Sequence, residues 1–478
     1  MTGDGEATHI TADAAAFIEK TRFEDIPDDA VRIARRCILD GLGLMVAGSA
    51  EHSVRILAAE AVDQGGRPDA LVLTRGAARA PAPIAARVLG TAGHAHDWDD
   101  TQVSRDPRHV YGLLTHPTIP PLAAALALAQ RLGTGGRRTV DGRAFVTAFV
   151  TGFEVECKIS EWMLTDHYRK GFHSSATVGT FGAAVAAAKL LGLDGRGLLN
   201  ALGMAASFAA GLRCNFGTMT KPLHVGRAAE NGVTAALLAA RGFEADPAAI
   251  DGPWGFLQVT AGGYYPEKLS QDFGRTWSIA DPGVSIKPYP SGIVTHQSMD
   301  AMLKLVTNND IKPADVETIR FFAGSNILDP IRYPVANDHL QAKFSMAALL
   351  SMIVIARRAG RAEFTDGFVK SAEMQDMQRR VTCTLDPQIE AQGMDRTRSR
   401  IELVTRSGKT FTQEADPRYR GGPANPMTDA ELEQKTAACV AGLMDDAARD
   451  RLIAAARGVV DMGDAGELAR VIQTEGEA

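Results

Sequence analysis

The chain has 478 residues, a formal net charge of −6 and 45 % hydrophobic residues. That apolar content excludes disorder as the main state and is enough for a large core. The slight negative charge argues against a nucleic-acid-binding protein, which usually carries a basic surface. Aromatic residues make up only 6 %, whereas alanine and glycine are abundant. This composition favours closely packed helices over an all-β sandwich.

The cysteines and the N-terminus indicate the compartment. Five cysteines are scattered without a CxxC pair, so neither a disulfide framework nor a structural zinc site is expected. A reducing, cytoplasmic compartment is therefore the expectation. The N-terminal segment lacks the basic stretch and apolar run of a secretory signal. No run of about 18 uninterrupted apolar residues occurs, so we expect no membrane span.

Helical patterns dominate up to about residue 265. Pro81 and Pro83 suit the first turn of a helix that extends to about residue 93. Apolar residues at three-to-four spacing predict further helices over 28–48, 120–132, 144–161, 176–191 and 228–241. The stretch 178–189 is apolar almost all round, which is typical of a helix inside a bundle.

The pattern changes near residue 270. Alternating residues predict strands over 318–322 and 380–385, and a hairpin over 400–405 and 409–414. A buried helix is expected between them over 344–356. After a Gly- and Pro-rich linker, the capping box of Thr428 and Glu431 begins a last helical region, up to about residue 473.

The order helical, α+β, helical predicts a mainly α protein with an α+β domain inserted into a helical one. We place the first helical part at 1–266, the α+β domain at 267–423 and the C-terminal helical part at 424–478.

The densest polar cluster is His94-Ala-His-Asp-Trp-Asp-Asp-Thr101, directly after an apolar helix. Its histidines and aspartates suit a metal site, and consecutive acids can hold Mg²⁺ with a diphosphate substrate. They equally suit acid–base work, in which carboxylates orient hydroxyls or histidines. The third interpretation is an acidic helix end that faces solvent.

Two further histidines precede apolar helices. The His116-Pro117 step holds its histidine in an extended conformation. His173 lies just before the helix at 176–191, and the positive end of that helix disfavours a charged imidazole. A neutral imidazole can act as a base, although an isolated histidine is as often structural.

Two lysine–proline segments complete the candidates. Lys221-Pro222 places its lysine at the start of a helix, where Lys221 and Arg227 could bind carboxylates or simply be solvated. Lys287-Pro-Tyr-Pro-Ser-Gly292 is a stiff loop that could equally be an interdomain hinge. No GxSxG, GxGxxG, HExxH or Walker A motif occurs. Serine-hydrolase, dinucleotide, zincin and P-loop chemistry therefore lose support.

Together these clusters resemble the MmgE/PrpD family over nearly the whole chain. The segments that carry the resemblance are GHAHDWDDT (93–101), THPT (115–118), GFHSSATVGTFGAAVAAAKLLGL (171–193), GTMTKPLHVGRAAENG (217–232) and KPYPSG (287–292). The family includes 2-methylcitrate dehydratase, cis-aconitate decarboxylase and iminodisuccinate epimerase. The resemblance implies that the α+β domain is a lid on the helical domain, and that the protein is a homodimer. It also implies catalysis on a small carboxylate without metal, flavin or nicotinamide. The charge and the short apolar runs predict no nucleic-acid or membrane partner.

Family positions carry over one residue at a time. The resemblance implies catalytic roles for His173 as base, His116 as acid, Asp97 as an orienting carboxylate, and Lys221 as a cation for substrate carboxylates. We also assign substrate binding to Thr101, Lys287, Tyr289 and Gly292, with Arg213 as a helper.

One position departs from the family. The residue five places after Lys287 is a histidine in the decarboxylases and a cysteine in many other members, but here it is Gly292. This argues against decarboxylation in particular. We therefore expect a dehydratase acting on a hydroxylated di- or tricarboxylate, with an epimerase or isomerase as the alternative. The loop over 102–115 is long, and its Arg105, Arg108, His109 and Tyr111 could reshape the pocket.

Overall fold

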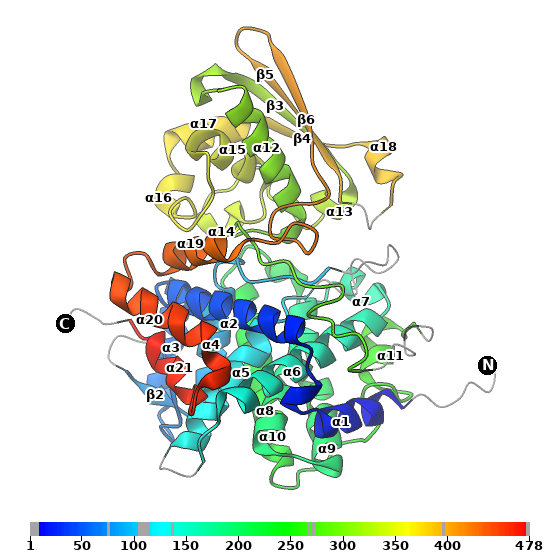
Figure 1. The fold of residues 1–478 in the computed structure, drawn as a ribbon. Helices are drawn as coiled ribbons and strands as arrows, with labels where there is room; N and C mark the ends of the chain where they lie inside the picture. The colour runs from blue at the N-terminus through cyan, green and yellow to red at the C-terminus, as the bar shows by residue number, and fades with distance from the viewer. Residues whose placement is uncertain are drawn as a thin grey trace, which may run out of the picture.

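The structure, a computed structural model, describes residues 9–73, 77–103, 115–134, 138–265, 268, 273–393 and 397–474. It is mainly helical, as the composition predicted. A larger helical body and a smaller α+β unit lie one above the other (Figure 1). The arginines, His109 and Tyr111 of the long loop fall outside the described residues.

The helical body is built from both ends of the chain. A short antiparallel pair, β1 (Ala70–Leu71) and β2 (Arg79–Ala80), lies at its edge. Its first group of helices is α1 (Ile10–Lys20), α2 (Asp28–Ser49), α3 (His52–Gln64), α4 (Ala82–His94), α5 (Ile119–Gly133), α6 (Gly142–Trp162), α7 (Asp166–Arg169), α8 (Ser174–Leu191), α9 (Gly195–Phe208), α10 (Thr220–Ala239) and α11 (Phe256–Ala261). The second group is α19 (Asp429–Val440), α20 (Asp446–Arg457) and α21 (Leu468–Val471).

Helix α8 runs through the centre of this body, next to α5, α6, α9 and α10. Its length and mean hydropathy would also suit a membrane span, yet 89 % of that window is buried inside the protein. The core of the helical body therefore accounts for its apolar surface on all sides. Gly192, in the left-handed conformation, ends it.

Small residues bring α10 close to its neighbours. A Cβ atom on Gly226 would lie 2.1 Å from Thr91 Oγ1 of α4, and one on Gly232 would lie 2.4 Å from the Ala184 amide of α8. These contacts leave no room for side chains, so glycine sets the spacing of the three helices. The same contacts hold the start of α10 near the turn that follows α4.

The α+β unit has its own hydrophobic core. Its sheet has the order β4-β3-β5-β6, with β3 parallel to β4 and antiparallel to β5, and β5 and β6 forming a hairpin. Helices α12, α15 and α17 pack against the sheet (Figure 1). The strands are β3 (Val316–Ala323), β4 (Val381–Leu385), β5 (Ser399–Thr405) and β6 (Thr410–Glu414). The helices are α12 (His296–Asn308), α13 (Ser325–Leu328), α14 (His339–Ala342), α15 (Met346–Ala356), α16 (Asp366–Val369), α17 (Ala372–Arg379) and α18 (Pro387–Glu390).

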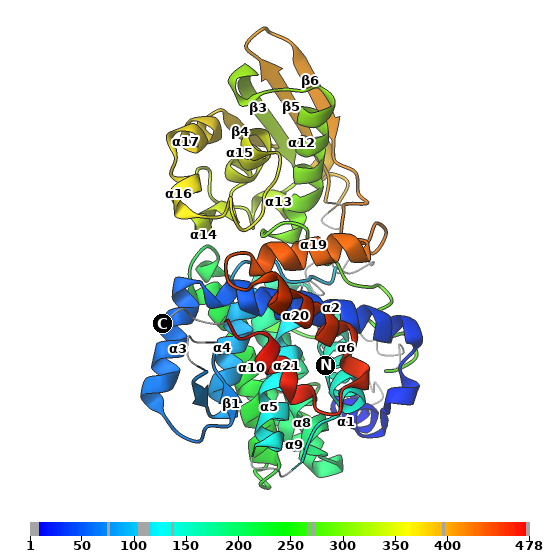
Figure 2. The same ribbon diagram turned by 60° about the vertical axis from the view of Figure 1, so that its left-hand side comes forward.

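Most predicted elements occur within a few residues of their expected bounds. The helix expected over 228–241 begins earlier, at Thr220, because Pro222 falls in the first turn, where no amide donor is needed. After the α+β unit the chain returns to the helical body through α19, which lies between the two (Figures 1 and 2). Thr428 and Glu431 form the capping box expected there.

Candidate active site

The turn after α4 carries the first candidate carboxylate. Asp97 adopts a left-handed conformation with φ of 51°, and its amide donates to the His94 carbonyl at 3.0 Å. Aspartate is one of the few residues besides glycine that adopts this conformation readily. The tight turn directs the Asp97 side chain inward, where the residue is buried.

Two lysines converge on this buried carboxylate. Asp97 Oδ1 lies 2.8 Å from Lys287 Nζ and 3.2 Å from Lys221 Nζ. Burial by itself would raise the pKa of Asp97, but the charges of Lys221 and Lys287 outweigh it and hold that pKa well below its usual value. Asp97 is therefore an anion at neutral pH and neutralises part of the lysine charge.

His94 connects Lys221 to a second carboxylate. Its Nδ1 lies 2.8 Å from Asp99 Oδ1, and its Nε2 lies 2.8 Å from Lys221 Nζ. Because an ammonium group can only donate, Nε2 is the acceptor and Nδ1 carries the proton. Burial and the charge of Lys221 lower the pKa of His94 well below its usual value. His94 thus orients Lys221 while remaining neutral.

His116 lies beside the Asp97 carboxylate, and its ring packs edge-on against that of His94 with centroids 4.5 Å apart. Its Nδ1 donates to the Asp100 carbonyl at 2.9 Å, and its Nε2 lies 3.7 Å from Asp97 Oδ1. Its amide donates to Ser175 Oγ at 2.9 Å, at the start of α8. Burial lowers the pKa of His116 well below its usual value, although the charge of Asp99 opposes this shift. In the absence of substrate, the imidazole is neutral with a lone pair on Nε2.

His173 is the N-cap residue of α8. Its amide donates to the Gly211 carbonyl at 3.0 Å, and its ring packs edge-on against Phe216 with ring centroids 5.1 Å apart. Burial and the charge of Lys221 lower its pKa well below the usual value. Its Nδ1 lies 3.1 Å from Nδ1 of His224 on α10.

These side chains surround a cavity of about 50 Å³ between the helical body and the α+β unit. The helical body contributes the polar wall and two aromatic residues. The α+β unit contributes a mostly apolar wall. The lining residues are Asp97, Thr101, His116, Tyr168, His173, Phe216, Lys221, Gly292, Ile293, Val294, Asn326, Pro330, Ile331 and Phe344.

Six of the nine predicted site residues line this cavity: Asp97, Thr101, His116, His173, Lys221 and Gly292. The other three lie outside its lining. Lys287 has no exposed surface, and its ammonium group donates hydrogen bonds to the carbonyl and the carboxylate of Asp97. Arg213 stacks over the Tyr168 ring at 3.6 Å, and Tyr289 donates to Asp300 Oδ1 at 2.7 Å. In this structure these three residues support the site rather than face the cavity.

The sequence did not assign roles to three neighbours of these residues, namely His94, Asp99 and His224. His94 and Asp99 belong to the polar cluster already singled out, so only their pairing was missed. His224 lies one helical turn after Lys221, a spacing that puts both side chains on the same face of a helix.

Two groups here have the ligand types of a metal site. In each group, one ligand atom per residue lies within 4.8 Å of the others. The first group is His94, His116 and His173, and the second is His94, Asp97, Asp99 and His116. However, Nε2 of His94 accepts from Lys221, whose ammonium group also contacts Asp97. The residues present therefore fit a site built around lysine cations better than one built around a metal ion.

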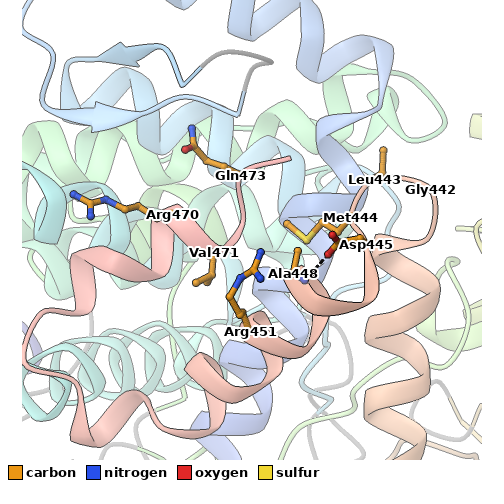
Figure 3. Close-up of a pocket in the computed structure, with 9 residues that line it drawn as sticks. All are labelled: Gly442, Leu443, Met444, Asp445, Ala448, Arg451, Arg470, Val471 and Gln473. Atoms are coloured by element: carbon orange, nitrogen blue, oxygen red, sulfur yellow. Dashed lines mark hydrogen bonds between the residues drawn. The ribbon is translucent and has the colours of Figure 1, made fainter. Parts of the chain in front are cut away.

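A second, more open pocket of about 650 Å³ lies on the helical body between α20 and α21 (Figure 3). Arg451 and Arg470 project beside it, and its other lining residues come from the turn before α20, from α20 itself and from the C-terminal segment. No predicted site residue lines it, so we assign the chemistry to the cavity between the helical body and the α+β unit.

Comparison with known proteins shows the family of this chain. The model of the MmgE/PrpD N-terminal domain matches residues 12–268, and that of the C-terminal domain matches residues 289–458. Human cis-aconitate decarboxylase is 26 % identical over 469 residues, which cover 97 % of this chain and 94 % of that protein. Cis-aconitate decarboxylase of Aspergillus terreus is 25 % identical over 464 residues, 91 % of this chain and 90 % of that protein. A cis-aconitate decarboxylase-like protein of Aspergillus oryzae is 30 % identical over 311 residues, 63 % of this chain and 62 % of that protein. The chain belongs to the MmgE/PrpD family.

Proposed function

We propose that this protein is a lyase that removes a proton next to a substrate carboxylate, and specifically a dehydratase of a hydroxylated di- or tricarboxylate. One observation supports the reaction above all. Two neutral imidazoles, His116 and His173, have ring centroids 6.3 Å apart beside one cavity that also contains Lys221. An elimination needs such a pair, one group to take a proton and one to protonate the leaving hydroxyl.

Lys221 would hold the substrate carboxylate and stabilise the negative charge that develops on it. Proton abstraction next to a carboxylate leaves an enolate-like dianion. A fixed cation in a water-poor site stabilises that negative charge most strongly. Lys221 is already oriented by Asp97 and His94. Little reorganisation would therefore accompany the reaction.

His173 would act as the base because its lowered pKa keeps it unprotonated at neutral pH. His116 would act as the acid only after gaining a proton. A bound substrate carboxylate would supply the negative charge that raises the pKa of His116. Thr101 Oγ1, 3.4 Å from His116 Nδ1, would help to place the leaving hydroxyl. Movement of the α+β unit as a lid would admit substrate and then exclude water.

Decarboxylation is the second candidate, and the curated relatives favour it because they are named cis-aconitate decarboxylases. Loss of CO₂ leaves the same kind of carbanion, so Lys221 would serve both reactions. Epimerisation is the remaining alternative, since two proton-transfer groups on opposite sides of one carbon would also perform it.

Proton NMR in D₂O, without added metal, tests the proposal with 2-methylcitrate, citrate, cis-aconitate and iminodisuccinate in turn. A new alkene signal from a hydroxy acid would establish dehydration. Loss of a carboxyl carbon would establish decarboxylation, and deuterium uptake without net product would indicate epimerisation. The last two outcomes would overturn the dehydratase.

A variant pair locates the chemistry. His173→Ala should lower turnover about 10²- to 10⁴-fold, the contribution of a general base. The matched control is His52→Ala, an exposed histidine at the start of α3. Full activity in His173→Ala would remove His173 as the base.

A further inference from the structure

The two imidazoles of His173 and His224 face each other through the same type of nitrogen. Their Nδ1 atoms are 3.1 Å apart, and their ring centroids are 5.3 Å apart. A neutral imidazole carries one N–H, so a hydrogen bond between these atoms places the proton on one Nδ1 and the lone pair on the other. The pair therefore has two arrangements, which differ in the tautomer of His173.

The backbone holds this pair in place. The His173 amide is fixed to the Gly211 carbonyl. A Cβ atom on Gly211 would lie 2.3 Å from Ala176 Cβ and 3.3 Å from Cγ of His224, so only glycine allows this close approach. His224 itself belongs to the long helix α10, one turn after Lys221. The distance between the two rings is thus set by the same helix that places the candidate substrate cation.

Charge at the pair favours two neutral rings. Lys221, His94 and His116 surround His173, and burial and the charge of Lys221 lower the pKa of His224 to about 4. Additional positive charge is unfavourable here, because Lys221 is close to both histidines. One proton is therefore shared between the facing Nδ1 atoms in the resting site.

We propose that His224 is the positioning residue for His173: it accepts the Nδ1 proton of His173 and so leaves Nε2 of His173 as the basic nitrogen in the cavity. In the opposite arrangement, His173 Nε2 would carry the proton and could not take one from substrate. When Nε2 accepts a proton from the substrate carbon, His173 becomes an imidazolium. Its Nδ1–H bond to neutral His224 then becomes charge-assisted and stronger. In the dehydration His173 releases this proton to solvent after the alkene has formed, and His116 takes up the proton that it gave to the leaving hydroxyl, so the alkene and water are the net products.

This inference rests on the proposed function for the role of His173 as base, but the tautomer can be measured without turnover. Selective ¹⁵N labelling of histidine in the full-length protein reports the protonated nitrogen of each ring by NMR, and His173→Ala assigns the His173 signals. We expect protonated Nδ1 and unprotonated Nε2 at neutral pH. Protonated Nε2 in the wild type would overturn the proposal, whichever substrate is found.

Two substitutions of His224 separate positioning from packing. Asn places an amide oxygen near the former Nδ1 and can accept the hydrogen bond, whereas Leu cannot. We expect His224→Leu to lose the Nδ1–H tautomer and to lower kcat about 10- to 100-fold, as for the loss of a hydrogen bond to a charged group, with KM within about twofold. The acidic limb of its pH–rate profile should move to lower pH, because the imidazolium has lost a partner.

His224→Asn should restore the tautomer and most of kcat. His167→Asn is the control for packing, since His167 is a buried histidine that bonds Thr177 and does not line the cavity. Equal losses in His224→Asn and His224→Leu, with an unchanged pH profile and tautomer, would show a structural role only. An absence of turnover on every tested acid would refute the substrate choice and leave the tautomer result to decide this proposal.

Discussion

Lys287 gives the sharpest test of how the site is assembled. It has no exposed surface, and its ammonium group donates to both the carbonyl and the carboxylate of Asp97, at 2.9 and 2.8 Å. Lys287→Met fills a similar volume but removes the charge. Removing one partner of a buried ion pair costs about 3–5 kcal/mol. Because Lys221 remains beside Asp97, we expect the lower end, about 3 kcal/mol of unfolding free energy.

The pH dependence of this loss has a definite sign. The folded pKa of Asp97 is lowered, so its ionisation stabilises the fold above the unfolded pKa of about 3.9, and this contribution is lost as pH falls through the folded pKa. Without Lys287 the folded pKa rises. Lys287→Met should therefore lose this contribution at a higher pH than the wild type during acidification.

Urea unfolding at pH 7 and at several acidic pH values measures both effects. The matched control is Lys312→Met, whose ion pair with Asp310 is exposed to solvent, so its removal should leave the free energy of unfolding nearly unchanged. Asp97→Asn combined with Lys287→Met should be more stable than the sum of the single changes, because the unpaired charge is gone. A loss below about 1 kcal/mol in Lys287→Met, or strict additivity, would refute the buried ion cluster.

Three further predictions concern the frame around the site. The hydrogen bond to Glu51 raises the pKa of His339. The free energy of unfolding that His339→Gln removes should therefore be largest below about pH 6.5 and should shrink above the folded pKa. A pH-independent difference in urea unfolding would contradict this. Gly292 has a φ of −56°, and an added Cβ atom would make only an ordinary 3.4 Å contact. Gly292→Ala should therefore be about 0.4–1 kcal/mol more stable, but it should raise KM because it narrows the cavity. A lower melting temperature would be the contrary result. Gly226→Ala should lower the free energy of unfolding by about 1–3 kcal/mol, because it separates α10 from α4. The control Gly197→Ala, whose added Cβ atom has no contact below 3.4 Å, should be neutral or stabilising. Equal melting temperatures of the two variants would disprove the close packing.

The sequence by itself determined most elements and the main members of the site. Periodicity and capping residues are local signals, so they placed α2, α4, α8 and the β5–β6 hairpin within a few residues. Five of the six predicted residues that line the cavity belong to the polar clusters of the sequence, and Gly292 ends the KPYPSG segment. The family resemblance, not local pattern, gave these positions their roles. The family followed from the order and spacing of these clusters.

Only the tertiary structure decided which of these residues face the cavity and which of them hold the others in place. Lys287 meets Asp97 across 190 positions, and Lys221 meets His94 across 127. Such pairs depend on how helices and loops pack, which local propensity does not encode. Packing therefore put Lys287 behind Asp97 instead of in the cavity and stacked Arg213 on Tyr168. The same packing brought Nδ1 of His224 to 3.1 Å from Nδ1 of His173, because Gly211 leaves room beside the His224 ring that a Cβ atom would fill.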